Sequence, residues 1–155
     1  MEFDIVFWNF LIRWLHVGSG IMWVGLLYYF NFVQVPAVAG MPDELKPAIG
    51  KHIAPRALFW FRWAALSTVV FGLLLAGAEG YLWDALMLGL TTNSPADATI
   101  GFGMWLGLIM AYNVWMIIWP GQKKILGMVP ATDEEKKPLP RKVLMASRTN
   151  VALSI

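Results

Sequence analysis

The sequence predicts an all-α, polytopic transmembrane helical bundle with three spans plus the start of a fourth and with its N-terminus outside. Three observations carry this prediction: composition, three long apolar stretches, and the distribution of charge between them. Of the 155 residues, 58% are hydrophobic and 14% are charged. Soluble domains have about 45–50% apolar residues and about a quarter charged ones, so this chain belongs to the membrane class.

The spans are predicted from stretches of about 20 apolar residues, the length that crosses a bilayer as a helix. The first covers about residues 5–35 and is expected to end at Pro36. The second covers about 57–78 and begins after Pro55, because proline suits a first helical turn. The third covers about 100–119 and is expected to end at Pro120. The acidic N-terminus lacks a basic n-region, so the first stretch is predicted to be a retained span.

The connecting segments differ in charge. The N-terminal tail and residues 79–99 contain no Lys or Arg, whereas residues 36–57 and 120–150 contain ten: Lys46, Lys51, Arg56, Lys123, Lys124, Lys136, Lys137, Arg141, Lys142 and Arg148. The positive-inside rule places the basic segments in the cytoplasm and the acidic ones outside. Because the topology explains both basic clusters, nucleic acid is not expected as a partner.

Smaller elements lie between and after the spans. Residues 80–90 are apolar but interrupted by Asp84, and they predict an amphipathic helix in the outer interface. Residues 120–142 are predicted to form a cytoplasmic linker. From about residue 146 the chain resembles the opening turns of a fourth span, which is expected to be truncated.

The strongly polar residues of the first span share one stripe. At about 100° per residue they fall within a sector about 60° wide: Asn9, Arg13, His16, Asn31 and Gln34. A polar side chain exposed to lipid is costly, so this stripe is expected to face protein or a water-filled cavity.

His16 is the main candidate for a functional residue. An intramembrane histidine can be a haem axial ligand, a proton relay or a substrate-binding group, or it can simply hydrogen-bond between helices. If His16 ligates the iron of haem b, the second ligand is expected to be a methionine or to come from outside this chain. His52, beside the basic residues before the second span, is expected to be exposed and too far away to share that haem.

Arg13 and Asn113 are the other two candidates. Arg13, one turn outward from His16, is suited to an anionic substrate or a haem propionate, or it can extend to the outer headgroups. Asn113 lies in the third span and needs a partner, for which His16, Asn9 and Asn31 are candidates. Gly103 and Gly107 in the same span predict close approach of another helix. With no cysteine in the sequence, disulfides and thiolate metal sites are excluded.

Several strings resemble the N-terminal transmembrane domain of the bacterial membrane-bound, cytochrome c-linked urate oxidase family. They begin at His16 (HVGSGIMWVG), Tyr29 (YFNF), His52 (HIAPRALFWFRW), Asn113 (NVWMIIWPGQKK) and Ala146 (ASRTN). Members of that family have roughly twice as many spans and end in a periplasmic cytochrome c domain. The CxxCH motif of such a domain is absent from this sequence.

The resemblance implies a membrane oxidoreductase domain of a bacterial inner membrane that passes electrons from a urate-like substrate toward a cytochrome c. His16 would then ligate haem or handle protons, and Arg13 would meet the substrate at the outer face. The alternative is a non-catalytic subunit that packs with the remaining membrane half or within a larger bioenergetic complex. A small transporter is a weaker third hypothesis, because three spans enclose a pathway only by oligomerising.

Overall fold

The computed structural model describes residues 4–155, and over that range it contains helices and turns but no strand. Residues 1–3, where the predicted outer N-terminal tail begins, lie outside the described residues. Three continuous helices, Ile5–Gly40, Lys46–Ala78 and Pro95–Ile125, are long and apolar enough to cross a membrane. The predicted all-α membrane bundle is therefore confirmed as a fold class.

Each long helix consists of α-helical segments joined by one π-helical turn: α1 (Ile5–Tyr28), η1 (Tyr29–Gln34) and α2 (Val35–Gly40); α3 (Lys46–Ala48), η2 (Ile49–Ile53) and α4 (Ala54–Ala78); α6 (Pro95–Tyr112), η3 (Asn113–Ile118) and α7 (Trp119–Ile125). The first, with 36 residues, is about 54 Å long at 1.5 Å per residue. It is thus much longer than the roughly 30 Å hydrocarbon core.

The helices do not end at Pro36 and Pro120, contrary to the prediction. Proline inside an α-helix removes one hydrogen bond and crowds the carbonyl four residues earlier. Here the residue before each proline donates its N–H to the carbonyl five residues earlier: Val35 to Phe30, Ala54 to Ile49, and Trp119 to Val114. This wider turn relieves the conflict, so each helix continues past its proline.

The connecting elements are α5 (Leu82–Leu86), α8 (Asp133–Lys136) and α9 (Leu139–Leu153). The helix predicted over 80–90 is shorter than expected, because a turn with positive φ at Leu88 (55°) and Gly89 (68°) follows α5. Most of α7 lies within the predicted linker, and α9 begins seven residues earlier than the expected start at about 146. The early start follows from Pro140, which lies in the first turn of α9, where proline is favourable.

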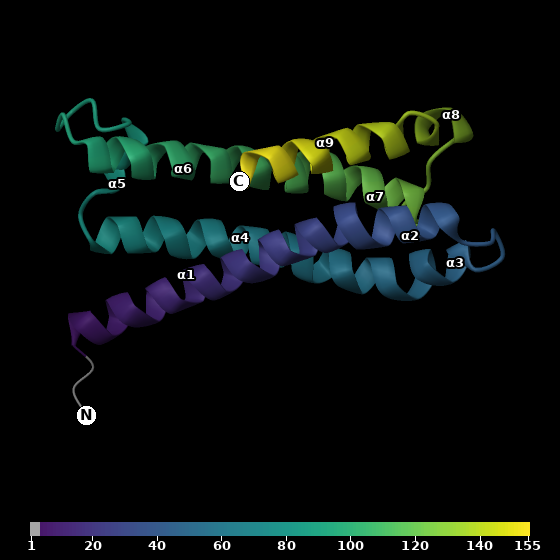
Figure 1. Ribbon diagram of the computed structural model, residues 1–155, viewed down its shortest axis with the longest axis horizontal. Helices are drawn as coiled ribbons and strands as arrows, with labels where there is room; N and C mark the ends of the chain where they lie inside the picture. The colour runs from purple at the N-terminus through teal and green to yellow at the C-terminus, as the bar shows by residue number, and fades with distance from the viewer. Residues whose placement is uncertain (1–3) are drawn as a thin grey trace.

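The helices lie roughly side by side along one long axis (Figure 1). Helices α1 and α4 form the most extensive antiparallel pair, and α6 with its continuation runs along α4. The last helix, α9, packs mainly against η3 and α7. The outer half, as predicted from charge, therefore contains α1, α4 and α6, whereas the inner half also contains α9.

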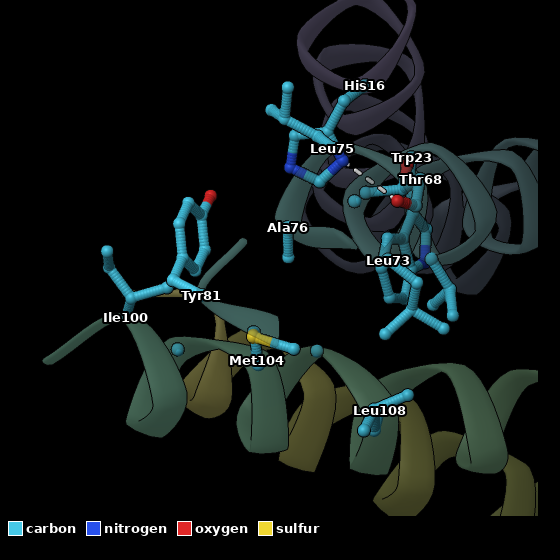
Figure 2. Close-up of a pocket in the computed structure, with 14 residues that line it drawn as sticks. His16, Trp23, Thr68, Leu73, Leu75, Ala76, Tyr81, Ile100, Met104 and Leu108 are labelled. Atoms are coloured by element: carbon cyan, nitrogen blue, oxygen red, sulfur yellow. Dashed lines mark hydrogen bonds between the residues drawn. The ribbon is translucent and has the colours of Figure 1, made fainter. Parts of the chain in front are cut away.

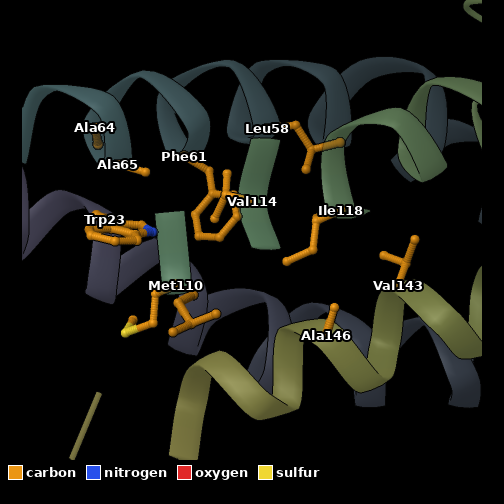
Figure 3. Close-up of a cluster of buried hydrophobic side chains, with 11 residues drawn as sticks. Trp23, Leu58, Phe61, Ala64, Ala65, Met110, Val114, Ile118, Val143 and Ala146 are labelled. Carbon is orange, nitrogen blue, oxygen red and sulfur yellow. The ribbon is translucent and has the colours of Figure 1, made fainter. Parts of the chain in front are cut away.

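The apolar core lies mainly in the inner half, where four helical segments converge (Figure 3). Its central side chains are Trp23 and Leu27 of α1, Phe61 of α4, Val114 of η3, and Val143 and Ala146 of α9. Arg62 also lies in this region, with its guanidinium carbon 3.8 Å from the centroid of the Trp119 ring. This contact places the cation against an aromatic face instead of lipid.

Most of the apolar surface of the three long helices remains outside this core. Only 11–28% of the most apolar segment of each helix is buried inside the bundle. The exposed remainder is compatible with contact with a lipid bilayer, as predicted.

Candidate functional site

A cavity of about 340 Å³ lies between α1, α4 and α6 in the outer half of the bundle (Figure 2). This volume is within the range of about 300–1,000 Å³ that is typical of small-molecule sites. Most of the lining is glycine or aliphatic, and the polar groups come from four side chains: His16, Trp23, Thr68 and Tyr81.

His16 is held in one orientation by α4. Its Nδ1 atom lies 2.8 Å from the backbone carbonyl oxygen of Thr68. Because a carbonyl only accepts hydrogen bonds, Nδ1 carries the hydrogen, and a neutral ring then has its lone pair at Nε2. Nε2 makes no hydrogen bond to residues 4–155, and in Figure 2 it points away from Thr68 toward the side where Tyr81 lies. It can therefore accept a proton, accept a hydrogen bond or ligate a metal.

Gly72 provides the space that this orientation needs. A Cβ at Gly72 would lie 2.8 Å from Cε1 and 3.0 Å from Nδ1 of His16. The hydroxyl of Thr68 donates to the carbonyl of Ala64 at 2.8 Å, so it does not compete for the imidazole. One turn of α4 thus fixes both the position and the tautomer of the ring.

Tyr81 is positioned by the end of α4. Gly80 has a φ of 83°, a left-handed conformation that glycine adopts without strain. The N–H of Tyr81 donates to the carbonyl of Ala76 at 3.1 Å, and that of Gly80 donates to Gly77 at 3.2 Å. These bonds form a Schellman motif, which turns the chain so that Tyr81 lines the outer end of the cavity.

The opposite wall is the face of α6 that contains Gly103, Met104 and Gly107. A Cβ at either glycine would meet no atom within 4 Å. The prediction that this glycine pair supports close helix approach is therefore wrong. The two glycines face open space because the neighbouring helices are separated there by the cavity.

Arg13 lies outside the cavity lining, at the outer end of the α1–α4 pair. Its Nη2 atom is 2.9 Å from Oε1 of Glu79, and Nδ2 of Asn9 is 3.4 Å from the same oxygen. Glu79 directly precedes the turn that positions Tyr81, so this cluster is near the outer end of the cavity. The Arg13 side chain is 60% exposed, which leaves it accessible at this end of the bundle.

Asn113 is part of a separate hydrogen-bonded network in the inner half. Its Nδ2 atom donates to Oδ1 of Asn150 at 2.8 Å, and Nδ2 of Asn150 donates to the carbonyl of Met110 at 3.0 Å. None of the three expected partners contacts it, because α9 supplies Asn150 instead. The structure therefore does not bring Asn113 together with His16 in the cavity.

Two residues of the predicted polar stripe contact other helices, whereas the Arg13 side chain is 60% exposed. His16 contacts α4, and Asn31 donates to Oγ of Ser147 on α9 at 2.8 Å. His52 is exposed, as expected, and lies in η2. It precedes Thr68 by 16 positions on one continuous helix, which corresponds to about 24 Å at 1.5 Å per residue. The two histidines therefore cannot share one metal.

Within residues 4–155, no group of three or more His, Asp or Glu side chains could hold a metal ion. His16 is therefore not part of a cluster of three or more such side chains in the described chain. Sequence reasoning did not identify Gly72, Tyr81 or Met104 as parts of this site. The one signal in the sequence is the pair Gly103 and Gly107 of α6, which predicts helix packing.

The chain matches nothing in three comparisons. No protein-family model, no curated protein and no solved structure is similar to it. Function is therefore inferred from the geometry of the cavity and from the motifs that resemble the urate oxidase family.

Proposed function

We propose that the chain is a membrane oxidoreductase domain, similar to the N-terminal domain of cytochrome c-linked urate oxidases. In this proposal it resides in a bacterial inner membrane with its N-terminus in the periplasm. It passes electrons from a urate-like substrate toward a cytochrome c. The observation that carries the proposal is His16, whose Nδ1–H is bonded to a carbonyl while its Nε2 remains available beside a cavity.

The redox group that we propose for this site is haem b. Histidines that ligate metals usually donate the other ring N–H to a carbonyl or carboxylate, which fixes the ring. The Thr68 carbonyl has this role for His16. Haem supplies one-electron transfer when bound. His16 would hold it, and open space lies beside Gly103 and Gly107 on the opposite wall of the cavity.

The substrate would meet the protein at the outer end of the α1–α4 pair. The Arg13 guanidinium is paired with one carboxylate oxygen of Glu79 and is still largely exposed. A planar anion such as urate could replace Glu79 there, because guanidinium groups bind planar anions through two parallel hydrogen bonds. Tyr81 would lie between this anion and the cavity.

The charges on the helices support the proposed orientation. The ends formed by α3 and α7 contain Lys46, Lys123 and Lys124, whereas the ends at Asp4 and Glu79 are acidic. By the positive-inside rule, the basic ends formed by α3 and α7 are expected to lie on the cytoplasmic side. The substrate cluster would then face the periplasm, where a cytochrome c can be reached.

Urate-dependent reduction of cytochrome c by the protein in lipid nanodiscs tests this function. We expect reduction with the unaltered chain, at least a tenfold slower rate with His16→Ala, and an unchanged rate with His52→Ala as the matched control. Equal rates for the two variants, or no urate-dependent reduction at all, would contradict the proposal.

The alternative function is that of a non-catalytic membrane subunit in a larger bioenergetic complex. A second groove on another face of the α1–α4 pair favours it, because small residues there leave space beside exposed aromatic ones. Gly18 and Ser19 lie beside Trp14, Trp60 and Trp63. Small residues in membrane helices allow another helix to approach closely. This alternative predicts stable co-purification with larger partners and no bound cofactor.

A further inference from the structure

Two cations contact the same aromatic ring at the basic end of the bundle, the end that contains α7 and its lysines. The guanidinium carbon of Arg62 lies 3.8 Å from the centroid of the Trp119 ring, and Nζ of Lys123 lies 5.5 Å from that centroid. The two charges are therefore at most 9.3 Å apart, the sum of these two distances. Like charges this close repel each other, and more strongly where little water screens them. An anion bound to both would relieve the repulsion.

Neither cation has an acidic partner within residues 4–155. The ion pairs of the described chain at this end involve other cations, such as Lys124, whose Nζ is 2.9 Å from Oε1 of Glu135. The guanidinium group of Arg62 has five N–H donors, and none of them donates a hydrogen bond to a described residue. The charges of Arg62 and Lys123 are thus available to a ligand.

The position of Arg62 in α4 directs its side chain toward the basic end. Side chains on a helix tilt toward the helix N-terminus, and the N-terminus of α4 lies at that end. The helix that contains Arg62 is apolar and long enough to cross a membrane. Donors at the edge of a bilayer need acceptors, and Trp119 is of a residue type enriched at headgroup depth. Phosphate oxygens of lipid headgroups are the acceptors available there.

Exposed aromatic rings lie beside these cations. Phe59 is 43% exposed and Trp63 is 42% exposed, and the guanidinium carbon of Arg62 is 5.3 Å from the centroid of the Phe59 ring. The indole N–H of Trp115 donates to the backbone carbonyl of Arg62 at 3.2 Å, which fixes α4 against η3 at this point. The surface therefore combines positive charge with apolar area, a combination suited to a ligand with an anionic head and apolar chains.

We propose that Arg62 and Lys123 bind the phosphodiester of an anionic phospholipid. The planar guanidinium group donates two parallel hydrogen bonds to phosphate oxygens, a geometry for which arginine is suited. The Lys123 ammonium neutralises the phosphate from the side of α7, and the acyl chains lie along Phe59 and Trp63. The lipid would thus connect α4 and α7. This site is separate from the cavity beside His16 and does not depend on the proposed redox function.

The experiment measures lipid retention by the full chain in detergent, with native mass spectrometry as the readout. Phosphatidylglycerol and phosphatidylcholine are titrated separately. The unaltered chain should bind one phosphatidylglycerol more tightly than phosphatidylcholine. Arg62→Gln should weaken phosphatidylglycerol binding about tenfold, because charge-assisted hydrogen bonds are lost. Lys123→Gln should weaken it about fivefold, as expected for one basic residue near a lipid phosphate. Arg62→Lys should give an intermediate affinity, because it keeps the charge but not the planar pair of donors.

Arg141→Gln is the matched control, because Arg141 is an exposed arginine of α9. It removes the same charge from the same end of the bundle and should change the affinity for phosphatidylglycerol by less than about twofold, since exposed charges are screened. Neither Arg62 nor Lys123 belongs to the apolar core, so their glutamine variants should melt near the unaltered chain in circular dichroism.

Three results would overturn the proposal. The first is equal retention of the two lipids by the unaltered chain. The second is an affinity for phosphatidylglycerol that Arg62→Gln and Arg141→Gln lower to the same extent, because the attraction would then depend only on total charge. The third is displacement of the lipid by an equal concentration of inorganic phosphate, which would show that the site recognises a free anion and that the exposed rings contribute nothing.

Discussion

The outer and inner halves of the bundle use intramembrane polar groups differently. In the inner half, Asn113, Asn150 and Asn31 donate hydrogen bonds to protein oxygens between helices. In the outer half, His16 uses one nitrogen to bind α4 and leaves the other beside a cavity. Paired groups of the first kind connect helices, whereas a fixed ring with an available nitrogen is typical of a binding site.

Glycine shows the same contrast. Gly121 in the inner half packs so tightly that an added Cβ would collide with Val143 of α9. Gly103 and Gly107 in the outer half adjoin open space. Small residues therefore allow close packing in one half and leave room for a ligand in the other.

The largest expected effect is on the position of His16. Gly72→Ala places a methyl group 2.8 Å from the imidazole, so the ring must move and its bond to Thr68 is lost. Loss of such an orienting bond typically costs 10–100-fold in metal affinity, and we expect this loss in a haem titration. Gly25→Ala, which meets nothing within 4 Å, should not change the affinity. Equal affinities for both variants would contradict the orienting role of α4.

The next largest effect is expected on stability, when the hydrogen bonds of Asn150 in the inner half are removed. Asn150 is fully buried, and Asn150→Leu removes its two hydrogen bonds and leaves the side-chain amide of Asn113 without its partner. Because one buried amide loses its partner, we expect a loss of about 1–2 kcal/mol in the free energy of unfolding, measured by denaturant titration in detergent. Haem affinity should change by less than twofold. A parallel loss of haem would show that the two halves are not separate units.

A smaller effect is expected at the outer cluster. The exposed Arg13–Glu79 pair should contribute about 1 kcal/mol or less to stability. Arg13→Gln should raise the urate concentration required for half-maximal rate several-fold. Glu79→Gln should lower it, because the carboxylate no longer competes for the guanidinium. If both variants shift this concentration in the same direction, the proposed exchange is wrong.

The smallest effect concerns the inner loop before α9. Hydrogen bonds from the Lys124 ammonium and the Thr132 backbone N–H lower the pKa of Glu135 from its ordinary value. A lowered folded-state pKa stabilises the protein above the unfolded-state pKa, and this contribution is lost as the pH falls through the folded value. The difference in unfolding midpoint between the unaltered chain and Glu135→Gln should therefore be largest near neutral pH and vanish on acidification. A difference that grows on acidification would have the wrong sign.

The sequence predicts the three long helices well, because apolar length and charge asymmetry are local signals. It also predicts that the polar stripe faces protein or a water-filled cavity, and His16 and Asn31 of that stripe do contact other helices. It does not predict continuation past Pro36 and Pro120, because the π-helical turns that allow it depend on backbone geometry, which the residue types alone do not reveal.

The site is predicted only in part. His16 is evident from its depth in the first span. Its partner is not, because every residue of α4 offers a backbone carbonyl and the packing of the helices selects Thr68. Asn150 was missed as a partner because the position of α9 is a tertiary feature. The sequence places glycines at two positions of α6, but only the structure shows that open space lies beside them.

We propose above that the cavity in the outer half holds a redox group, a haem b whose iron is ligated by His16. The most direct measurement is a reduced-minus-oxidised absorption spectrum of the purified chain beside His16→Ala and His52→Ala. We predict a haem b signal that is present in the unaltered chain and His52→Ala and lost in His16→Ala. A signal that persists in His16→Ala, or is absent from all three proteins, would contradict the claim.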